Sequence, residues 1–589
     1  MFVVTLPILA ATASLIGQHW HPSADQALEM LRVHDVGGVH TPLVGPYSRW
    51  GWAHPGPLLF WQLAPFDIAF GSTGALVGVG IANLVTTAAI VGVANRRGGL
   101  TLAALTGLML ALLQRSVGVD FLTDPWNPWV TFLPFVLLVF LVWSALCDDL
   151  IALPIAVIVG SYIVQTHVGY LPMVGGLLAI AFIRNIAVGL GDPQGLGTRP
   201  TGSASTTRPL TRRTRLLWGL VTALVGLHMW LPVIVQQVTG DPGNLGEIVA
   251  YAGDPGESTV GWSEAFGEMG SQIRPVAGWL TGETPLVAET ASTLPAIGLL
   301  LATAALGAWM WKRGRSDRAR LCVTTLLAVG LGVVSAARIT GDPLFFVVRW
   351  WWALGALVML TLGWMIVSSV PDALRRVAVG AVAAITVGIT IATLVGLPAQ
   401  VPDPKLSTAF GHLGQATAAS LDRNHRYIVR AAAPGSSNAL FIGGLERGLF
   451  VELEWRGFSV FVDRNPLSDL SYGPWRVART TQVHEIITIV PTAGLSSGYV
   501  PPTGAHIVAS WDPLTTAERD RATALEARIR AAAGDRAPTG ALLLNQAGTR
   551  SALQAAGASP AEIEELSTLQ QRGDSFTVFV SPASTPRAK

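Results

Sequence analysis

Long apolar stretches recur from the N-terminus to about Leu397. Each has roughly the 17 to 25 residues that a helix needs to cross a bilayer, and each is apolar on every face. The pattern predicts about eleven membrane-spanning helices, of which the first runs from Phe2 to Gly17. Ala11-Thr12-Ala13 resembles the cleavage site of a signal peptide, but no basic residues precede this stretch, so we interpret it as a retained helix.

From about Pro404 the pattern changes to short β-rich runs between polar helical stretches. Thr515 with Glu518 and Ser559 with Glu562 have the spacing of capping boxes and predict two helix starts. The predicted strands are Tyr427–Arg430, Ala439–Ile442, Phe458–Val462, Glu485–Val490 and Phe576–Val580. We therefore expect a mainly α protein, with a transmembrane helical domain at residues 1–400 and a soluble α/β domain at residues 401–589.

Composition supports this division. Half of the 589 residues are apolar, only 13% are charged, and the mean hydropathy is +0.48, which excludes an ordinary soluble enzyme. The net charge of +2 is too small to favour nucleic acid as a partner. With only two cysteines the chain has neither a disulfide framework nor a four-thiolate metal site.

The placement of charges predicts the topology, because short cytoplasmic loops collect Arg and Lys. Basic residues gather in alternate loops, at Arg96, Arg97, Arg184, Arg199, Arg208, Arg212, Arg213, Arg215, Lys312, Arg313, Arg315, Arg318, Arg320, Arg375 and Arg376. These loops are expected in the cytoplasm, as are the N-terminus and the flexible linker from Gly191 to Thr211. The segment from His19 to Thr73 and the C-terminal domain are then extracytoplasmic.

The loop from Gln237 to Thr290 carries eight acidic residues and only one arginine, Arg274, so it is also expected outside the cell. The acidic spacing does not match the twelve-residue calcium loop. We therefore favour a solvated acidic surface over a cation site. No cofactor is predicted with certainty, and a divalent cation remains an open alternative.

The first external segment contains the densest group of polar and aromatic residues in the membrane part of the chain. Ser23 and Gln26 are spaced as the start of a helix that continues to Arg32 and that we expect along the membrane surface. Asp25 and Glu29 are four residues apart and share one face of that helix, followed by Arg32. The prediction is a pair of carboxylates at the membrane edge.

After this helix the run from Trp50 to Trp61 reads Trp-Gly-Trp-Ala-His-Pro-Gly-Pro-Leu-Leu-Phe-Trp. Its prolines and glycine must break any helix and turn the chain back toward the membrane. An Asp-led helix followed by a His-Pro-x-Pro-Leu-x-x-Trp segment resembles the GT-C superfamily of membrane glycosyltransferases, especially the protein O-mannosyltransferases and lipid A aminoarabinose transferases. Those families have an Asp-Glu motif and a Lys-Pro-Pro-Leu-x-x-Trp run, whereas here Gln26 and His54 stand at the second acidic and the lysine positions.

The resemblance implies that Asp25 is the catalytic carboxylate and that a sugar moves, with inversion, from a polyprenyl-phosphate donor. The chemistry agrees, because the acceptor hydroxyl needs a general base as it attacks the anomeric carbon. The departing lipid phosphate needs a cation, for which arginine is suited. The candidates left open are Arg32, Arg49, Arg115, Arg338 and Arg349.

Further substrate-binding candidates come from other external segments. Arg349 begins an inward-running span beside Trp350-Trp351-Trp352, where an ionisable residue indicates function, although an interfacial aromatic belt explains it equally. Asp124 and Asn127 precede the fourth span and are expected either to position donor or metal, or to cap a helix. His167 lies in a short external turn and is expected to face the same cavity, unless it is structural. Glu29 and His54 complete the candidate set.

The function predicted from the sequence is transfer of arabinofuranose or mannose from a polyprenyl-phosphate donor to an envelope glycan, glycolipid or protein in the plasma membrane. The expected partners are the lipid-linked donor, the acceptor and membrane lipids. A transporter or flippase for a lipid-linked precursor is the alternative, but transporters are typically built from internal repeats, and none is evident here. A non-catalytic membrane scaffold is a third interpretation.

Overall fold

The computed structural model describes residues 2–583, except for residues 119, 192–210, 284, 286, 398–399, 433–443, 479–482, 492–498, 538–541, 543 and 545–546. Contacts divide the chain into two compact units. The helical unit comprises Met1–Gln18 and Val33–Gln400, and the sheet unit comprises His19–Arg32 and Val401–Lys589. The predicted linker from Gly191 to Thr211 lies almost wholly outside the described residues.

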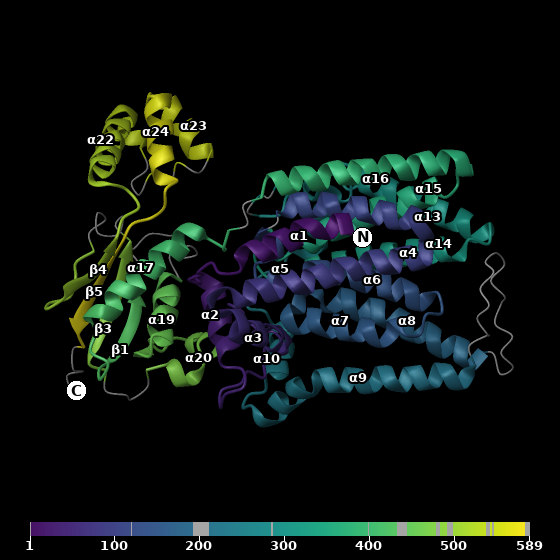
Figure 1. The fold of residues 1–589 in the computed structure, drawn as a ribbon, viewed down its shortest axis with the longest axis horizontal. Coiled ribbons are helices and arrows are strands. Elements are labelled where there is room, and N and C mark those ends of the chain that lie inside the picture. The colour runs from purple at the N-terminus through teal and green to yellow at the C-terminus, as the bar shows by residue number, and fades with distance from the viewer. Residues whose placement is uncertain are drawn as a thin grey trace. The chain divides into compact units, whose positions relative to one another are not determined.

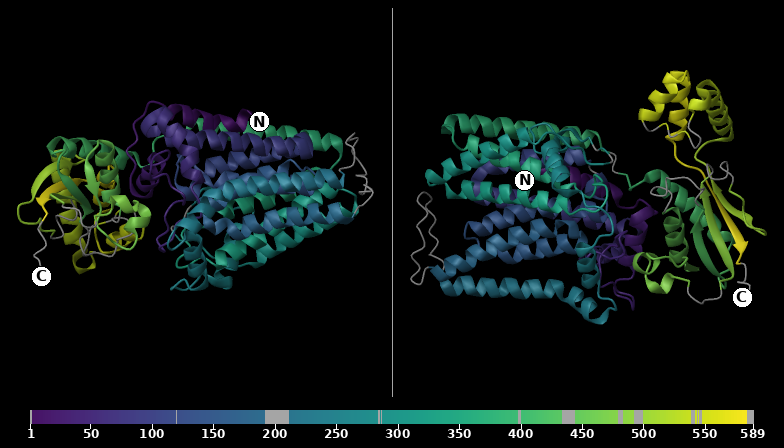
Figure 2. Two further views of the ribbon diagram at one scale, coloured as in Figure 1. Left: turned by 90° about the horizontal axis from the view of Figure 1, so that it is seen from below. Right: turned by 180° about the vertical axis from the view of Figure 1, so that it is seen from behind.

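The helical unit is a bundle of long helices that run side by side (Figures 1 and 2). Its helices are α1 (Phe2–Leu15), α3 (Leu58–Phe70), α4 (Gly74–Val117), α5 (Asn127–Val130), α6 (Phe132–Leu146), α7 (Ala152–Thr166), α8 (Leu171–Gly191), α9 (Arg212–Thr239), α10 (Asn244–Gly253), α11 (Gly261–Gln272), α12 (Gly278–Thr281), α13 (Leu294–Lys312), α14 (Ser316–Ala337), α15 (Trp350–Val367) and α16 (Asp372–Val395). The most deeply buried is α6, all fifteen residues of which are buried.

Among the described residues, eight helical segments are long and apolar enough to cross a membrane. One of them, Leu58–Val117, contains a chain reversal at Gly99, whose φ of 63° ends one arm of α4 and begins the other. Asn83 of the first arm donates a hydrogen bond to the Leu122 carbonyl just beyond the second arm, which places both ends together. About eleven spans result only if these arms count separately and the shorter apolar helices Phe2–Leu15 and Ala152–Thr166 are included.

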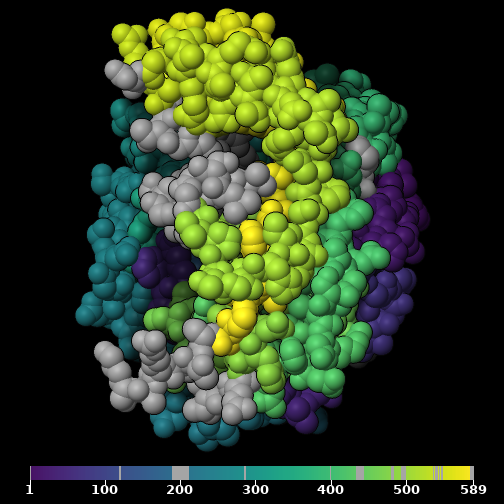
Figure 3. Space-filling view, turned by 90° about the vertical axis from the view of Figure 1, so that its left-hand side faces the viewer, coloured from purple at the N-terminus to yellow at the C-terminus, as the bar shows by residue number. Residues whose placement is uncertain are grey.

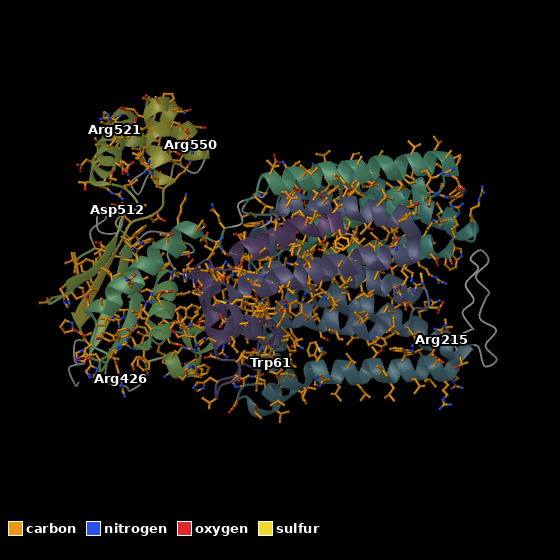
Figure 4. All side chains as sticks on the ribbon, in the orientation of Figure 1. Trp61, Arg215, Arg426, Asp512, Arg521 and Arg550 are labelled. Carbon is orange, nitrogen blue, oxygen red and sulfur yellow. The ribbon has the colours of Figure 1, made fainter. Side chains whose placement is uncertain are left out.

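The basic residues of alternate loops meet at one end of the bundle, around two adjacent aspartates. Asp148 pairs with Arg184 and Arg215 at 2.8 and 2.7 Å. Asp149 pairs with Arg96 and Arg97. These contacts bring the end of the first arm of α4, the residues after α6, the C-terminal part of α8 and the start of α9 to one side. Figure 4 shows Arg215 at this end and Trp61 of α3 at the opposite end.

The sheet unit contains a five-stranded mixed sheet in the order β2-β1-β3-β5-β4. Its strands are β1 (Arg426–Ala431), β2 (Ser459–Phe461), β3 (Glu485–Pro491), β4 (His506–Trp511) and β5 (Phe576–Pro582). Strand β1 is parallel to β2 and β3, whereas β5 is antiparallel to β3 and β4. Four predicted strands are thus confirmed and β4 was missed. The predicted strand Ala439–Ile442 lies outside the described residues.

Two groups of helices accompany the sheet. Helices α17 (Pro404–Ser420) and α19 (Leu445–Trp455) pack against each other and the strands, and a short α20 (Ser468–Ser471) follows β2. Helices α22 (Thr516–Ala533), α23 (Ala547–Ala555) and α24 (Pro560–Gln570) form a lobe with its own apolar core (Figure 3). The Thr515–Glu518 capping box is confirmed. The one at Ser559 is wrong, because that residue is the N-cap but its side chain makes no capping bond.

The predicted helix after the first span is confirmed as α2 (Ala24–His34), which directly follows Ser23. Most of it packs in the sheet unit rather than in the helical unit. His21 Nδ1 lies 2.7 Å from Glu452 Oε1 of α19, and the His21 backbone N–H donates to the Ser407 hydroxyl of α17. The segment from His19 to Arg32 therefore belongs to the sheet unit, although more than 360 positions of sequence separate it from the rest of that unit, which begins at Val401.

Candidate functional site

A tight loop positions the first candidate residues of the helical unit. In an antiparallel turn, the Gly45 N–H donates to the His54 carbonyl and the His54 N–H donates to the Pro46 carbonyl, each at 2.8 Å. Gly56 then presses against the end of α7, where a Cβ would lie only 2.1 Å from Gln165 Oε1. At Gly45 only glycine fits, because a Cβ would lie 2.6 Å from the Gln165 backbone oxygen and 2.7 Å from that of Gly56. Pro57 follows, and α3 begins at Leu58, so the predicted turn back into the bundle is confirmed.

His54 and His167 stack on one another at the end of α7. Their ring centroids are 5.1 Å apart, and both side chains are buried. The Val168 N–H donates to His54 Nδ1 at 3.1 Å, which fixes the proton of a neutral His54 on Nε2. Burial lowers the pKa of His167 to about 4, and burial together with His167 lowers the pKa of His54 well below its usual value. The pair is therefore uncharged at neutral pH.

Asp124 and Asn127 lie next to this pair, and their side chains form hydrogen bonds with backbone groups. The Trp126 N–H donates to Asp124 Oδ1 at 2.9 Å, and Asn127 Nδ2 donates to the Thr166 carbonyl at 3.1 Å. Asp124 therefore orders the turn before α5 but does not cap the helix, because the N-cap of α5 is Trp126 and no side chain caps it. Asn127 ties the start of α5 to the end of α7, so both residues belong to the same end of the bundle as His167.

Arg349, at the N-terminus of α15, is 6% exposed and lies among aromatic rings. Its guanidinium carbon is 4.1 Å from the Trp352 ring centroid, 4.9 Å from that of Phe345 and 5.4 Å from that of Trp129. The Nε atom has no hydrogen-bond partner among the described residues. Burial lowers the pKa of Arg349 to about 10, so the side chain remains a cation at neutral pH.

Beside Arg349 the structure reveals a pocket that sequence reasoning missed. It is lined by Glu268 and Gln272 of α11, by Arg349, Trp351 and Trp352, and by Glu283, Pro285, Ala288, Phe345 and Val348. Glu268 is completely buried and accepts a hydrogen bond from Trp351 Nε1 at 3.0 Å. Its other oxygen, Oε1, has no partner among the described residues. Burial raises the pKa of Glu268 to about 7, and nearby Glu264 adds to the effect.

Glu268 corrects the view of the Gln237–Thr290 loop as one solvated acidic surface. Six of its acidic residues are exposed, namely Asp241, Asp254, Glu257, Glu264, Glu283 and Glu289, and Glu247 is half-buried. Glu268 differs because α11 packs against α13, α14 and α15. The apolar residues Ala265 and Met269 beside it were the available signal of a buried helix face. A count of acidic residues could not separate one buried carboxyl from its exposed neighbours.

The other predicted site residues follow two patterns. Arg49 stacks on Trp50, with 4.7 Å to the ring centroid, and the aromatic contacts continue through Tyr251 and Trp52 to His54. Arg49 thus belongs to the same end of the helical unit. Asp25, Glu29 and Arg32 instead belong to the sheet unit.

Within the sheet unit, Asp25 is held by an arginine of α19. Asp25 Oδ1 lies 2.6 Å from Arg447 Nη1, and the aspartate side chain is 37% exposed. Glu29 is buried, and Arg32 stacks on Trp475 at 5.1 Å. Arg447 was not among the predicted residues, because 422 positions separate it from Asp25. The described residues contain no group of three His, Cys, Asp or Glu side chains placed to hold a metal ion.

The architecture is that of a multi-pass helical membrane protein with a smaller sheet unit. Comparison with solved structures gives "Crystal Structure of ArnT from Cupriavidus metallidurans bound to Undecaprenyl phosphate", with a TM-score of 0.50 and 13% identity over 86% of this chain and 95% of the other. The apo structure of the same protein matches over the same shares at 14% identity, with a TM-score of 0.36. No family model and no curated protein matches the chain.

Proposed function

We propose that the protein is a membrane glycosyltransferase that takes a sugar from a polyprenyl-phosphate donor and transfers it to an extracytoplasmic acceptor. The observation that carries the proposal is the group of buried polar side chains at one end of a GT-C-like bundle, centred on Arg349. Burying a cation without a carboxylate partner is costly unless a ligand compensates it. The similar fold of ArnT, which was crystallised with undecaprenyl phosphate, supports a lipid-linked ligand.

In this proposal Arg349 binds the phosphate of the donor, because a guanidinium offers several N–H donors to phosphate oxygens. Its contacts with Trp352 and Phe345 fix the side chain in advance, so little entropy is lost on binding. Arg338, one of the alternatives, is exposed and donates to the Ala252 carbonyl instead. This difference favours Arg349 as the phosphate-binding residue and makes Arg338 a suitable control for substitution.

Asp25 is proposed as the general base that removes the proton of the acceptor hydroxyl. It is partly exposed, and its contact with Arg447 fixes its orientation. Arabinofuranose and mannose on a polyprenyl phosphate are the proposed donors, and the acceptor is a glycan, glycolipid or protein of the envelope. The proposed topology has the N-terminus in the cytoplasm and the sheet unit outside, so that Asp148 and its arginines face the cytoplasm.

The test is transfer of radiolabelled sugar from synthetic polyprenyl-phosphate arabinose and mannose to a membrane glycan extract. General-base catalysis is worth about 10²- to 10⁴-fold, so Asp25→Asn should lower turnover by that factor. Asp463→Asn is the matched control, since Asp463 also pairs with an arginine, Arg430, in the same unit and is similarly exposed.

The outcomes separate the components of the proposal. Wild-type transfer with loss only in Asp25→Asn supports both the class and the base. Equal turnover of Asp25→Asn and wild type keeps the transferase class and refutes Asp25 as the base. If the wild-type protein transfers neither sugar but moves the lipid-linked compound across a vesicle membrane, the transferase proposal is wrong and the transporter alternative holds.

A further inference from the structure

The pocket beside Arg349 contains polar atoms that the described protein leaves without partners. Above about pH 7, where Glu268 is ionised, its Oε1 and Gln272 Oε1 are acceptors to which no described residue donates, and Arg349 Nε is a donor without an acceptor among them. All three side chains line the same pocket, and two of them are at least nine-tenths buried. A buried polar group without a partner destabilises the protein, so such a cluster indicates a ligand.

The chemistry of the three atoms restricts the ligand. A simple anion supplies acceptors alone and leaves the two acceptor oxygens unpaired. A metal cation would have to enter next to the positive charge of Arg349. A hydroxyl group donates one hydrogen bond and accepts others, so a ring with several hydroxyls can satisfy both kinds of atom. The indole rings of Trp351 and Trp352, which also line the pocket, supply apolar surface for the C–H face of such a ring.

We infer that this pocket binds the sugar ring of the ligand, with hydroxyls donating to Glu268 and Gln272 and accepting from Arg349. The inference rests on the proposed function for the identity of the attached lipid phosphate. It adds a residue, Glu268, that senses the sugar rather than the phosphate. Trp351 orients that carboxyl, since its Nε1–H occupies Oε2 and leaves Oε1 for the ligand.

Glu268→Gln is a precise test, because the hydrogen bond from Trp351 fixes which way the new amide group points. Trp351 Nε1 can only donate, so the amide oxygen of the new glutamine must take the place of Oε2. The amide NH₂ then replaces the acceptor in the pocket with a donor, at unchanged volume. Glu264→Gln is the matched control, one turn earlier on α11 and exposed.

The full-length protein in nanodiscs should be titrated at about pH 8, where Glu268 is ionised, with polyprenyl-phosphate arabinose, polyprenyl-phosphate mannose and sugar-free polyprenyl phosphate. We expect the wild type and Glu264→Gln to prefer at least one sugar-bearing lipid over the sugar-free lipid. Glu268→Gln should lose about 10- to 100-fold of affinity for that lipid and none for the sugar-free lipid. Equal affinities of Glu268→Gln and wild type for the sugar-bearing lipids would overturn the inference.

Two further measurements distinguish a failure of the sugar-pocket inference from a failure of the proposed function. Binding of methyl arabinofuranoside and methyl mannoside needs no lipid, so sugar binding that depends on Glu268 supports the pocket even if no transfer occurs. Transfer by the wild type that is insensitive to Glu268→Gln supports the enzyme and refutes the pocket. If Glu268→Gln does not fold, Gln272→Ala replaces it, because Gln272 is only half-buried.

Discussion

The two ends of the helical unit use charge in opposite ways. At the end that contains Asp148 and Asp149, both carboxylates are paired with arginines from neighbouring helices. At the end that contains Arg349, one arginine and one carboxyl line a common pocket, and each retains an atom that no described residue partners. Oppositely charged side chains that pair with each other hold helices together, whereas buried charged groups with an unpartnered atom are typical of a binding site.

The largest expected effect concerns the unpaired cation. Replacing Arg349 by glutamine removes the charge proposed to stabilise the departing phosphate, which should lower kcat/KM for lipid-linked donors by about 10²- to 10³-fold. The exposed Arg338→Gln should change it less than about threefold, because surface charges contribute little. Steady-state transfer assays check both variants. Comparable losses in the two would mean that no single arginine carries the phosphate.

A second prediction uses the buried carboxyl. The pKa of Glu268 is raised from 4.5 to about 7, so the folded protein holds a proton that the unfolded chain releases. The free energy of unfolding should therefore fall as the pH rises from about 4.5 to 7, by about 3 kcal/mol in total. Glu268→Gln should remove this dependence. Denaturant unfolding at several pH values measures it, and parallel profiles for the two proteins would contradict a buried Glu268.

The stacked histidines should make the free energy of unfolding depend on pH with the opposite sign and a similar size. The pKa of His167 is lowered from 6.5 to about 4, so the unfolded chain binds a proton that the folded protein excludes. Stability from this group is complete above about pH 6.5 and is lost toward pH 4, by about 3 kcal/mol. His167→Gln should flatten that part of the profile. A variant that is as acid-sensitive as the wild type would show that His167 is not buried as a neutral ring.

The smallest effect is expected at the end of the helical unit where Asp148 and Asp149 pair with arginines. Burial would raise the pKa of Asp148, but hydrogen bonds from Arg184 and Arg215 lower it to about 2. Its stabilisation is present above about pH 4 and is lost as the pH falls toward 2. Because the side chain is 36% exposed, solvent screening reduces the effect, and Asp148→Asn should cost about 1 to 2 kcal/mol. Donor affinity should not change, and a loss of affinity would break the contrast between the two ends.

Much of the architecture was predictable because it depends on local patterns. Apolar length located the long helices, and short runs rich in β-branched and aromatic residues located four of the five strands. β4 was missed because half of its residues are exposed in a sheet-edge position, so its sequence carries little apolar signal. Ser559 was assigned a capping bond from its spacing to Glu562, yet spacing alone does not fix the side-chain rotamer.

The sequence by itself determined that the chain is a multi-pass helical protein with a C-terminal α/β unit, because hydropathy and turn residues act over a few positions. It also offered His54, Asp124, Asn127, His167 and Arg349 as candidate site residues, and the fold brings these five to one end of the bundle. Only the tertiary structure decided that Asp25 pairs with Arg447 and that Glu268 is buried beside Arg349. Burial and pairing depend on residues that are distant in sequence, and they control which charged groups are satisfied and which remain available to a ligand.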